Sequence, residues 1–200
     1  MRRIGLLCLP FTLLACADPV SESLTAPVTI MAARDGGVPQ NFQTHLAGDN
    51  EVPARETLAQ GNAKFQLAPD GESIEYKLIA SNINNAFMAH IHCGVAGTNG
   101  PIVVWLFPST APVPGPTGTG RHDGILAEGT FTSANIIARA SSDACPGGVS
   151  SLADLLAKIQ ANGTYVNVHT RDLDLAATAL QAGNFPGGEV RGQIDHGSGM

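Results

Sequence analysis

The sequence predicts an all-β protein, a single antiparallel, Greek-key-like β-sandwich of about eight strands with one short helix. Short segments alternate apolar and polar residues, residues typical of turns separate these segments, and only one segment has helical spacing. Strands of this length and number, within roughly 155 residues, are typical of one sandwich. Nothing in the pattern indicates a second core.

The N-terminus predicts a lipoprotein signal peptide. Arg2 and Arg3 precede an apolar run over residues 4–14, which is too short to span a bilayer as a helix. The run ends in Leu-Leu-Ala-Cys at Cys16, which resembles the bacterial lipobox. That resemblance implies cleavage after residue 15 and a diacylglycerol on the Cys16 thiol. The alternatives are an ordinary cleavable signal peptide and an uncleaved anchor.

The predicted lipid anchor places the protein in a bacterial cell envelope. Ala17 after the lipidated cysteine favours the outer membrane, facing the periplasm or the cell surface, although Asp18 leaves this point open. Loss of Arg2 and Arg3 leaves 9 basic residues against 17 acidic ones, a net charge of about −8. Such a charge disfavours nucleic acid and anionic lipid as partners, so we expect the acyl chains to hold the protein on the membrane.

Residues 16–40 lack periodicity and are predicted to be a flexible tether, whereas residues 41–195 form the domain. A first strand around Phe42 and Leu46 ends in a turn-rich stretch, and the next two segments flank the hairpin signal Pro69-Asp70-Gly71. The first five expected strands are residues 42–46, 61–67, 73–83, 86–94 and 102–108.

The second half of the domain contains the helix and the last three strands. Residues 108–124 are rich in proline and glycine and are expected not to pair in a sheet. Residues 151–163 carry leucine and isoleucine at helical spacing, with Gly163 as the expected C-terminal stop. The remaining strands are expected at residues 125–133, 164–170 and 187–194.

Two cysteines stay in the domain after the signal peptide is removed. Cys93 and Cys145 would lie in a compartment that permits disulfides, so their pairing is the simplest interpretation. The alternatives are two separate buried thiols, or Cys93 as a metal ligand beside its neighbouring histidines.

Three histidines are candidate metal ligands. His90 and His92 lie two residues apart on one expected strand, which puts both rings on one face with Cα atoms ~6.5–7 Å apart. His169, on a later strand, is the natural third ligand if the strands are neighbours. Three histidines with little carboxylate suit copper or zinc better than magnesium or calcium. The alternative is that these side chains are solvated or only form hydrogen bonds.

Three other residues are possible accessories to such a site. His45 lies on the first expected strand, and His122 lies in the expected loop, where it could complete a site or be solvated. Glu189 and Arg191 share a strand face, so we expect an ion pair between them that could extend to Glu51 or Asp49. An arginine that guides a substrate is the minor alternative.

Several segments together resemble the CHRD domain, a family named after chordin. They are HLAGDNEVP, GNAKFQL, AHIHCGVAGTNGPIVVWL, GTYVNVHT and GEVRG, in this order from Phe42 to Ile194. The family is defined by sequence and has no general activity, and its bacterial members are mostly exported. This chain departs from the pattern at His45, where a small residue is common, and in the proline-rich insertion around residues 112–116.

A fainter resemblance is to copper–zinc superoxide dismutases, whose β-sandwich has a His-x-His strand, a later histidine, a late arginine and a disulfide. The corresponding residues here would be His90, His92, His169, Arg191 and the pair Cys93–Cys145. That family needs a fourth copper histidine and a separate zinc site, for which only His45 or His122 remain.

The sequence therefore favours a binding or interaction module rather than an enzyme. No nucleophile elbow, phosphate-binding loop or dinucleotide motif is present. We expect a transition-metal site, with copper or zinc as the ion and no cofactor otherwise. A protein partner is possible but the sequence does not identify one. The second hypothesis is a copper-dependent oxidoreductase of the superoxide-dismutase type, and the third is a purely structural envelope domain.

Overall fold

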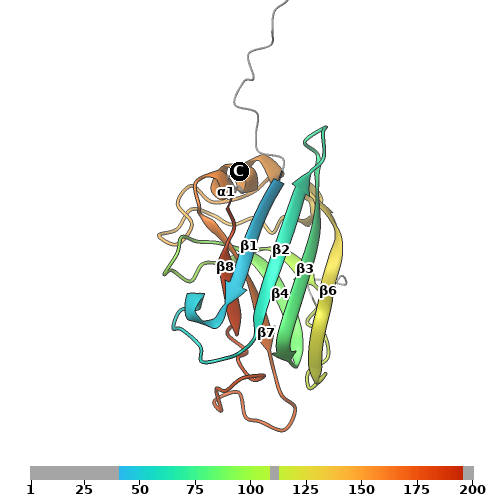
Figure 1. The fold of residues 1–200 in the computed structure, drawn as a ribbon. Helices are drawn as coiled ribbons and strands as arrows, with labels where there is room; N and C mark the ends of the chain where they lie inside the picture. The colour runs from blue at the N-terminus through green and yellow to red at the C-terminus, as the bar shows by residue number, and fades with distance from the viewer. Residues whose placement is uncertain (1–40, 109–112, 196–200) are drawn as a thin grey trace, which may run out of the picture. The chain divides into compact units, whose positions relative to one another are not determined.

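The computed structural model describes residues 41–108 and 113–195, which form eight antiparallel strands, two short 3₁₀ turns and one α-helix (Figure 1). The predicted lipidation site Cys16, the signal peptide and the tether lie outside the described residues. The strands are β1 (Asn41–Ala47), β2 (Gln60–Leu67), β3 (Ser73–Asn84), β4 (Ala86–Cys93), β5 (Ile102–Phe107), β6 (Arg121–Thr132), β7 (Thr164–Thr170) and β8 (Val190–Gln193). The turns are η1 (Gly48–Asn50) and η2 (Ser133–Asn135), and the helix is α1 (Leu152–Gln160).

The strands form one sheet in the order β5-β4-β7-β8-β1-β2-β3-β6. Strands β1, β2 and β3 are consecutive neighbours, β6 pairs with β3, and β8 returns to pair with β1. The arrangement resembles a Greek key in which the returning strand is β8 rather than β4. The half containing β1, β2, β3 and β6 lies over the half containing β4, β7 and β8 (Figure 1). This architecture confirms the predicted all-β sandwich with one helix.

The alternation in residues 60–67 forms one wall of the core. Ala63, Phe65 and Leu67 are buried while their neighbours on β2 are exposed, because successive side chains on a strand point to opposite faces. Antiparallel pairing with β3 places Phe65 opposite Tyr76, and Gly71 in the connecting turn has a φ of 76°. The predicted hairpin is confirmed.

Strand β6 begins earlier than the sequence predicts. Arg121 and His122 pair with Asn84 and Ile83 of β3, so the last residues of the glycine-rich segment do join the sheet, and the expectation that they would not was wrong. The guanidinium of Arg121 donates to the carboxylate of Asp123, which accepts the backbone N–H of Asn82. These polar bonds across two strands compensate for the low strand propensity of the segment.

Helix α1 lies within the predicted segment 151–163 and ends at Gln160, before the predicted stop at Gly163. The Ser151 side chain accepts the Asp154 backbone N–H as an N-cap, and Leu155 and Ile159 are buried. The left-handed residue after the helix is Asn162, with a φ of 53°, rather than Gly163. The Gly163 N–H then donates to the Lys158 carbonyl, as in a Schellman motif. Among the described residues, no helix has the length and apolar character needed to cross a membrane.

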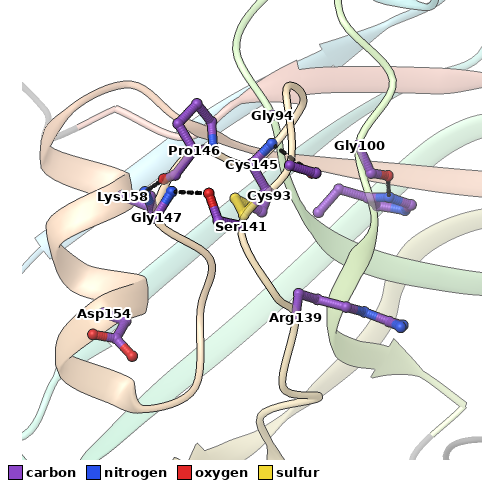
Figure 2. The surroundings of a disulfide bond; sticks show 12 residues. Cys93, Gly94, Gly100, Arg139, Ser141, Cys145, Pro146, Gly147, Asp154 and Lys158 are labelled. Atoms are coloured by element: carbon purple, nitrogen blue, oxygen red, sulfur yellow. Dashed lines mark hydrogen bonds between the residues drawn. A yellow bond between two sulfur atoms is a disulfide. The ribbon is translucent and has the colours of Figure 1, made fainter.

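A disulfide joins Cys93 at the end of β4 to Cys145 in the segment before α1 (Figure 2). The two Cα atoms are 5.4 Å apart and the closed loop spans 52 residues. A loop of this length corresponds to about 4 kcal/mol of stabilisation in the chain-entropy treatment. The bond confirms the predicted pairing and removes Cys93 as a metal ligand.

Strands β4 and β7 are buried on both faces. Their inner face carries apolar side chains such as Ile91, Val166 and Val168, which belong to the core. Their outer face carries polar and aromatic side chains that are nevertheless covered. Burying a polar side chain costs free energy unless it has a hydrogen-bonding or metal partner, so the buried polar side chains of this outer face indicate a candidate site.

Candidate metal centre

His90, His92 and His169 meet on the buried outer face of β4 and β7. Residues 90 and 92 share this face because they lie two positions apart on β4. Antiparallel pairing places Met88 opposite His169 and His90 opposite Asn167, so His169 lies diagonally next to His90. The exposed fractions of the three histidines are 0%, 7% and 6%, respectively.

The ring nitrogens have the spacing of a metal site. One nitrogen of each histidine lies within 4.8 Å of those of the other two, and Nδ1 of His90 is 3.1 Å from Nε2 of His169. Two nitrogens bound to one ion at 2.0–2.1 Å would be about 3.0–3.4 Å apart. The group of three predicted from the sequence is therefore brought together by the fold, with a geometry that could hold one ion.

Two backbone carbonyls orient the rings. Nδ1–H of His92 donates to the Gly100 carbonyl at 2.8 Å, and Nδ1–H of His169 donates to the Pro186 carbonyl at 2.9 Å. Each bond fixes the tautomer that leaves a lone pair on Nε2, which is how metal-binding histidines are usually held. Nε2 of His92 and Nε2 of His90 are buried and have no hydrogen-bond partner within the described part of the chain.

All three imidazoles are neutral at neutral pH. Burial lowers the pKa of His90 to about 2, helped by repulsion from the other two rings. Burial likewise lowers the pKa of His92 to about 4 and that of His169 to about 4. The site thus holds its ligands in the unprotonated form that a metal requires.

Aromatic rings surround the three ligands. Trp105 of β5 makes a T-shaped contact with His90 at 4.2 Å between ring centroids, and Tyr165 of β7 stacks on His92 at 4.7 Å. The Arg191 guanidinium lies 3.4 Å from the centre of the Tyr165 ring. Neither Trp105 nor Tyr165 was predicted from the sequence to belong to the site. Tyr165 could have been included, because it alternates with His169 along β7.

Arg191 holds the loop that positions His92. Its guanidinium donates to the carbonyls of Val95 and Thr98 and to the Asn99 side chain, all in residues 94–101 between β4 and β5. The same loop supplies the Gly100 carbonyl for His92. A Cβ at Gly100 would collide with the Cys93 carbonyl oxygen, so the loop can follow this path only with glycine there.

The predicted ion pair between Glu189 and Arg191 is not formed. Glu189 is buried and accepts hydrogen bonds from the hydroxyls of Thr57 and Thr170 and from the Gly183 N–H. Neutral donors satisfy this carboxylate, and Arg191 is satisfied by the 94–101 loop, so neither side chain turns to the other. Glu51 is near Arg191, and burial raises its pKa to about 7 against the opposing attraction of Arg191.

The two accessory histidines stay outside the group. His45 is exposed on β1, where its ring lies 3.4 Å from the Asn62 side chain. His122 lies on β6, in a strand rather than in the loop that the sequence predicted. Among residues 41–108 and 113–195, neither histidine joins His90, His92 and His169.

Comparison with known families gives one match. The family model of the CHRD domain matches residues 42–174, which include all three histidines of the site. No curated protein matches the sequence. The matched region ends before β8, although β8 pairs with both β7 and β1 and supplies Arg191.

The lowered histidine pKa values predict that the metal-free domain loses stability in mild acid. In the unfolded chain each histidine binds a proton below about pH 6.5, whereas in the folded state all three remain neutral between pH 5 and 6. Glu51 acts oppositely, since the folded state keeps its proton up to about pH 7. Unfolding should therefore take up about two protons net between pH 6 and pH 5. The free energy of unfolding then falls by roughly 3 kcal/mol for each unit by which the pH is lowered.

Urea denaturation of chelator-treated protein at pH 6 and pH 5 measures this slope. His92→Asn should reduce the proton uptake by about one, because it removes one buried imidazole. An unfolding free energy that does not change over this range would contradict the buried neutral histidines.

The contacts of Arg191 predict that it controls metal affinity without touching the ion. If the centre binds copper or zinc, Arg191→Ala should weaken binding about 10–100-fold, because the Gly100 carbonyl is no longer held against His92. Arg121→Ala, which removes an exposed arginine on β6, is the matched control and should bind like the wild type. A folded Arg191→Ala protein with wild-type affinity would limit the role of Arg191 to stability.

Proposed function

We propose that this chain, which belongs to the CHRD-domain family, is an exported, lipid-anchored binding module that holds one transition-metal ion at His90, His92 and His169. The observation that supports this proposal most directly is that three buried, neutral imidazoles lie together. Two of them donate their Nδ1–H to a backbone carbonyl. Copper and zinc are the ions that suit three imidazole ligands.

A purely structural role for the three histidines is less well supported. A buried imidazole nitrogen without a partner costs about 1–3 kcal/mol, and among the described residues Nε2 of His92 is such a nitrogen. A metal ion would use the free Nε2 lone pair of His92. It would also replace the contact between the nitrogens of His90 and His169 by two metal bonds.

The alternative of a copper-dependent oxidoreductase is less well supported, because such a site needs more histidines than the three that lie together here. A copper site of the superoxide-dismutase type needs a fourth histidine, and within the described part of the chain His45 and His122 lie elsewhere. The three-histidine geometry supports metal binding more directly than it supports turnover.

Export is supported by the domain itself as well as by the N-terminus. The Cys93–Cys145 bond is of a kind that persists in oxidising compartments and is rare in the cytosol. The lipobox-like sequence ending at Cys16 adds a site for acylation. We infer that the membrane, through the acyl chains, is a partner of this protein, in the envelope of a bacterium.

Metal binding can be followed through Trp105, the only tryptophan in the chain. Because its ring is in contact with His90, binding of Cu²⁺ should quench tryptophan fluorescence. His90→Ala and His169→Ala should each weaken binding at least about 100-fold, since each removes one of three ligands. Copper should bind more tightly than zinc, as the general affinity order requires.

His45→Ala and His122→Ala are the matched controls, because each removes a histidine outside the site. Both should bind as the wild type does. Equal affinity in all four variants would show that the three histidines do not form a site.

The anchor is tested by replacing the acylated thiol. Cys16→Ala should move the protein from the membrane fraction to soluble or unprocessed forms, because the residue that carries the acyl chains is gone. Membrane fractionation with mass spectrometry of the mature N-terminus measures both effects. An unchanged membrane fraction with a normally processed N-terminus would contradict lipidation.

A further inference from the structure

We infer that the three-histidine site is selective for monovalent copper, Cu(I), over the divalent ions Cu(II) and Zn(II). This inference rests on the proposed metal binding and specifies the ion. It is carried by the charges around His90, His92 and His169, by their burial and by the number of ligands that the site offers.

The ligands themselves carry no negative charge. All three are imidazoles, and in the described part of the chain no carboxylate or thiolate joins their group. Cys93, the closest sulfur in sequence, is in a disulfide and cannot bind as a thiolate. An ion in this site would keep its whole charge, because neutral nitrogens donate electron density without cancelling it.

The arginines that act on His92 are unfavourable to a cation. Arg191 lies over the Tyr165 ring that stacks on His92, and both Arg191 and Arg139 act repulsively on positive charge at His92. Two buried carboxyls lie in this region. Glu51 has Arg191 and Arg55 as its electrostatic partners, and Glu189 is held by the hydroxyls of Thr57 and Thr170 and the Gly183 N–H. The surroundings therefore favour the ion of lower charge.

Because the site is buried, the absence of negative charge among its ligands favours Cu(I) over divalent ions. His90 is fully buried, and His92 and His169 are nearly so. The Born cost of transferring an ion from water into a poorly polarisable interior grows with the square of its charge. The cost is therefore about four times larger for a divalent than for a monovalent ion. Divalent ions usually recover this cost from anionic ligands, which are missing here.

The number of ligands favours the same ion. Zinc in proteins is almost always four-coordinate, so a three-ligand site would leave it to recruit a water molecule or an outside ligand. Copper in the monovalent state is satisfied by two or three neutral nitrogens. Zn(II) has the same filled d shell, so the difference comes from the single charge of Cu(I), which needs fewer donors to compensate for lost hydration.

The experiment compares the affinities of the three ions for the detergent-extracted, metal-free protein at pH 7. Cu(I) is titrated without oxygen against bicinchoninate, and Cu(II) and Zn(II) are titrated against chelators of known affinity. We expect Cu(I) to bind about 1,000-fold more tightly than Cu(II). Such a ratio raises the potential of the bound copper couple by about 180 mV over that of aqueous copper, at 59 mV per tenfold. Zn(II) should bind more weakly still, because it follows Cu(II) in the general affinity order.

A substitution that adds a negative charge beside the histidines without changing the size of the side chain tests whether electrostatics cause the selectivity. Asn167 lies opposite His90 in the sheet and beside His92, and its Oδ1 is buried without a partner. Asn167→Asp should reduce the preference for Cu(I) over Cu(II) at least about tenfold, which corresponds to about 59 mV. Asn62→Asp makes the same substitution on the exposed face of β2 and should leave the ratio unchanged.

The outcomes separate this inference from the proposed function. If no ion binds, the proposed metal site itself is wrong. If Cu(II) or Zn(II) binds as tightly as Cu(I), the site stands but its selectivity for the monovalent ion is overturned. The wild-type ratio decides this point by itself, so a poorly folded Asn167→Asp protein would not prevent a decision. An unchanged ratio in a folded Asn167→Asp protein would overturn the electrostatic cause.

Discussion

The site depends on one constraint, namely that two backbone carbonyls hold the imidazoles of His92 and His169. Because Gly100 and Pro186 accept the Nδ1–H groups, both rings present an unprotonated Nε2 toward the same space. Neither carbonyl belongs to the sheet that carries the histidines. The loops over β4 and β7 are therefore part of the site, since without them these rings would lie on an open sheet surface, free to rotate and to take up protons.

The loops are held in turn by two charged side chains at β8. Arg191 binds the 94–101 loop through three acceptors, and the preceding Glu189 binds Thr57, Thr170 and the backbone at Gly183. Arg191 is satisfied by one covering loop, whereas Glu189 joins Thr57 and Gly183 of two other segments to Thr170 at the end of β7. Two oppositely charged residues that are close in sequence thus act as separate anchors, and they close the site from two sides.

The disulfide stabilises the same region. Cys93 follows His92 directly on β4, so the bond to Cys145 fixes the end of the strand from which the loop with Gly100 departs (Figure 2). Burial of the polar outer face is possible because this loop and the segment before β8 bring their own hydrogen-bond acceptors. The result is a dry, neutral group of nitrogens on the outside of a sheet, with a separate apolar core on its inside.

The local pattern of the sequence determined the strands, the single helix and the shared face of His90 and His92, because a period of two or of 3.6 residues is a property of neighbouring residues. The local pattern predicted the wrong start for β6, because pairing with Asn84 and Ile83 outweighs the poor strand propensity of its first residues. It also misjudged Glu189 and Arg191, because their partners lie far away in sequence. That His169 approaches His90, and that Gly100, Pro186, Trp105 and Tyr165 complete the surroundings, was decided only by the tertiary structure. Strand order and loop contacts join residues separated by well over a hundred positions, such as Thr57 and Glu189 or Ala47 and Arg191. No local periodicity encodes which of them will meet.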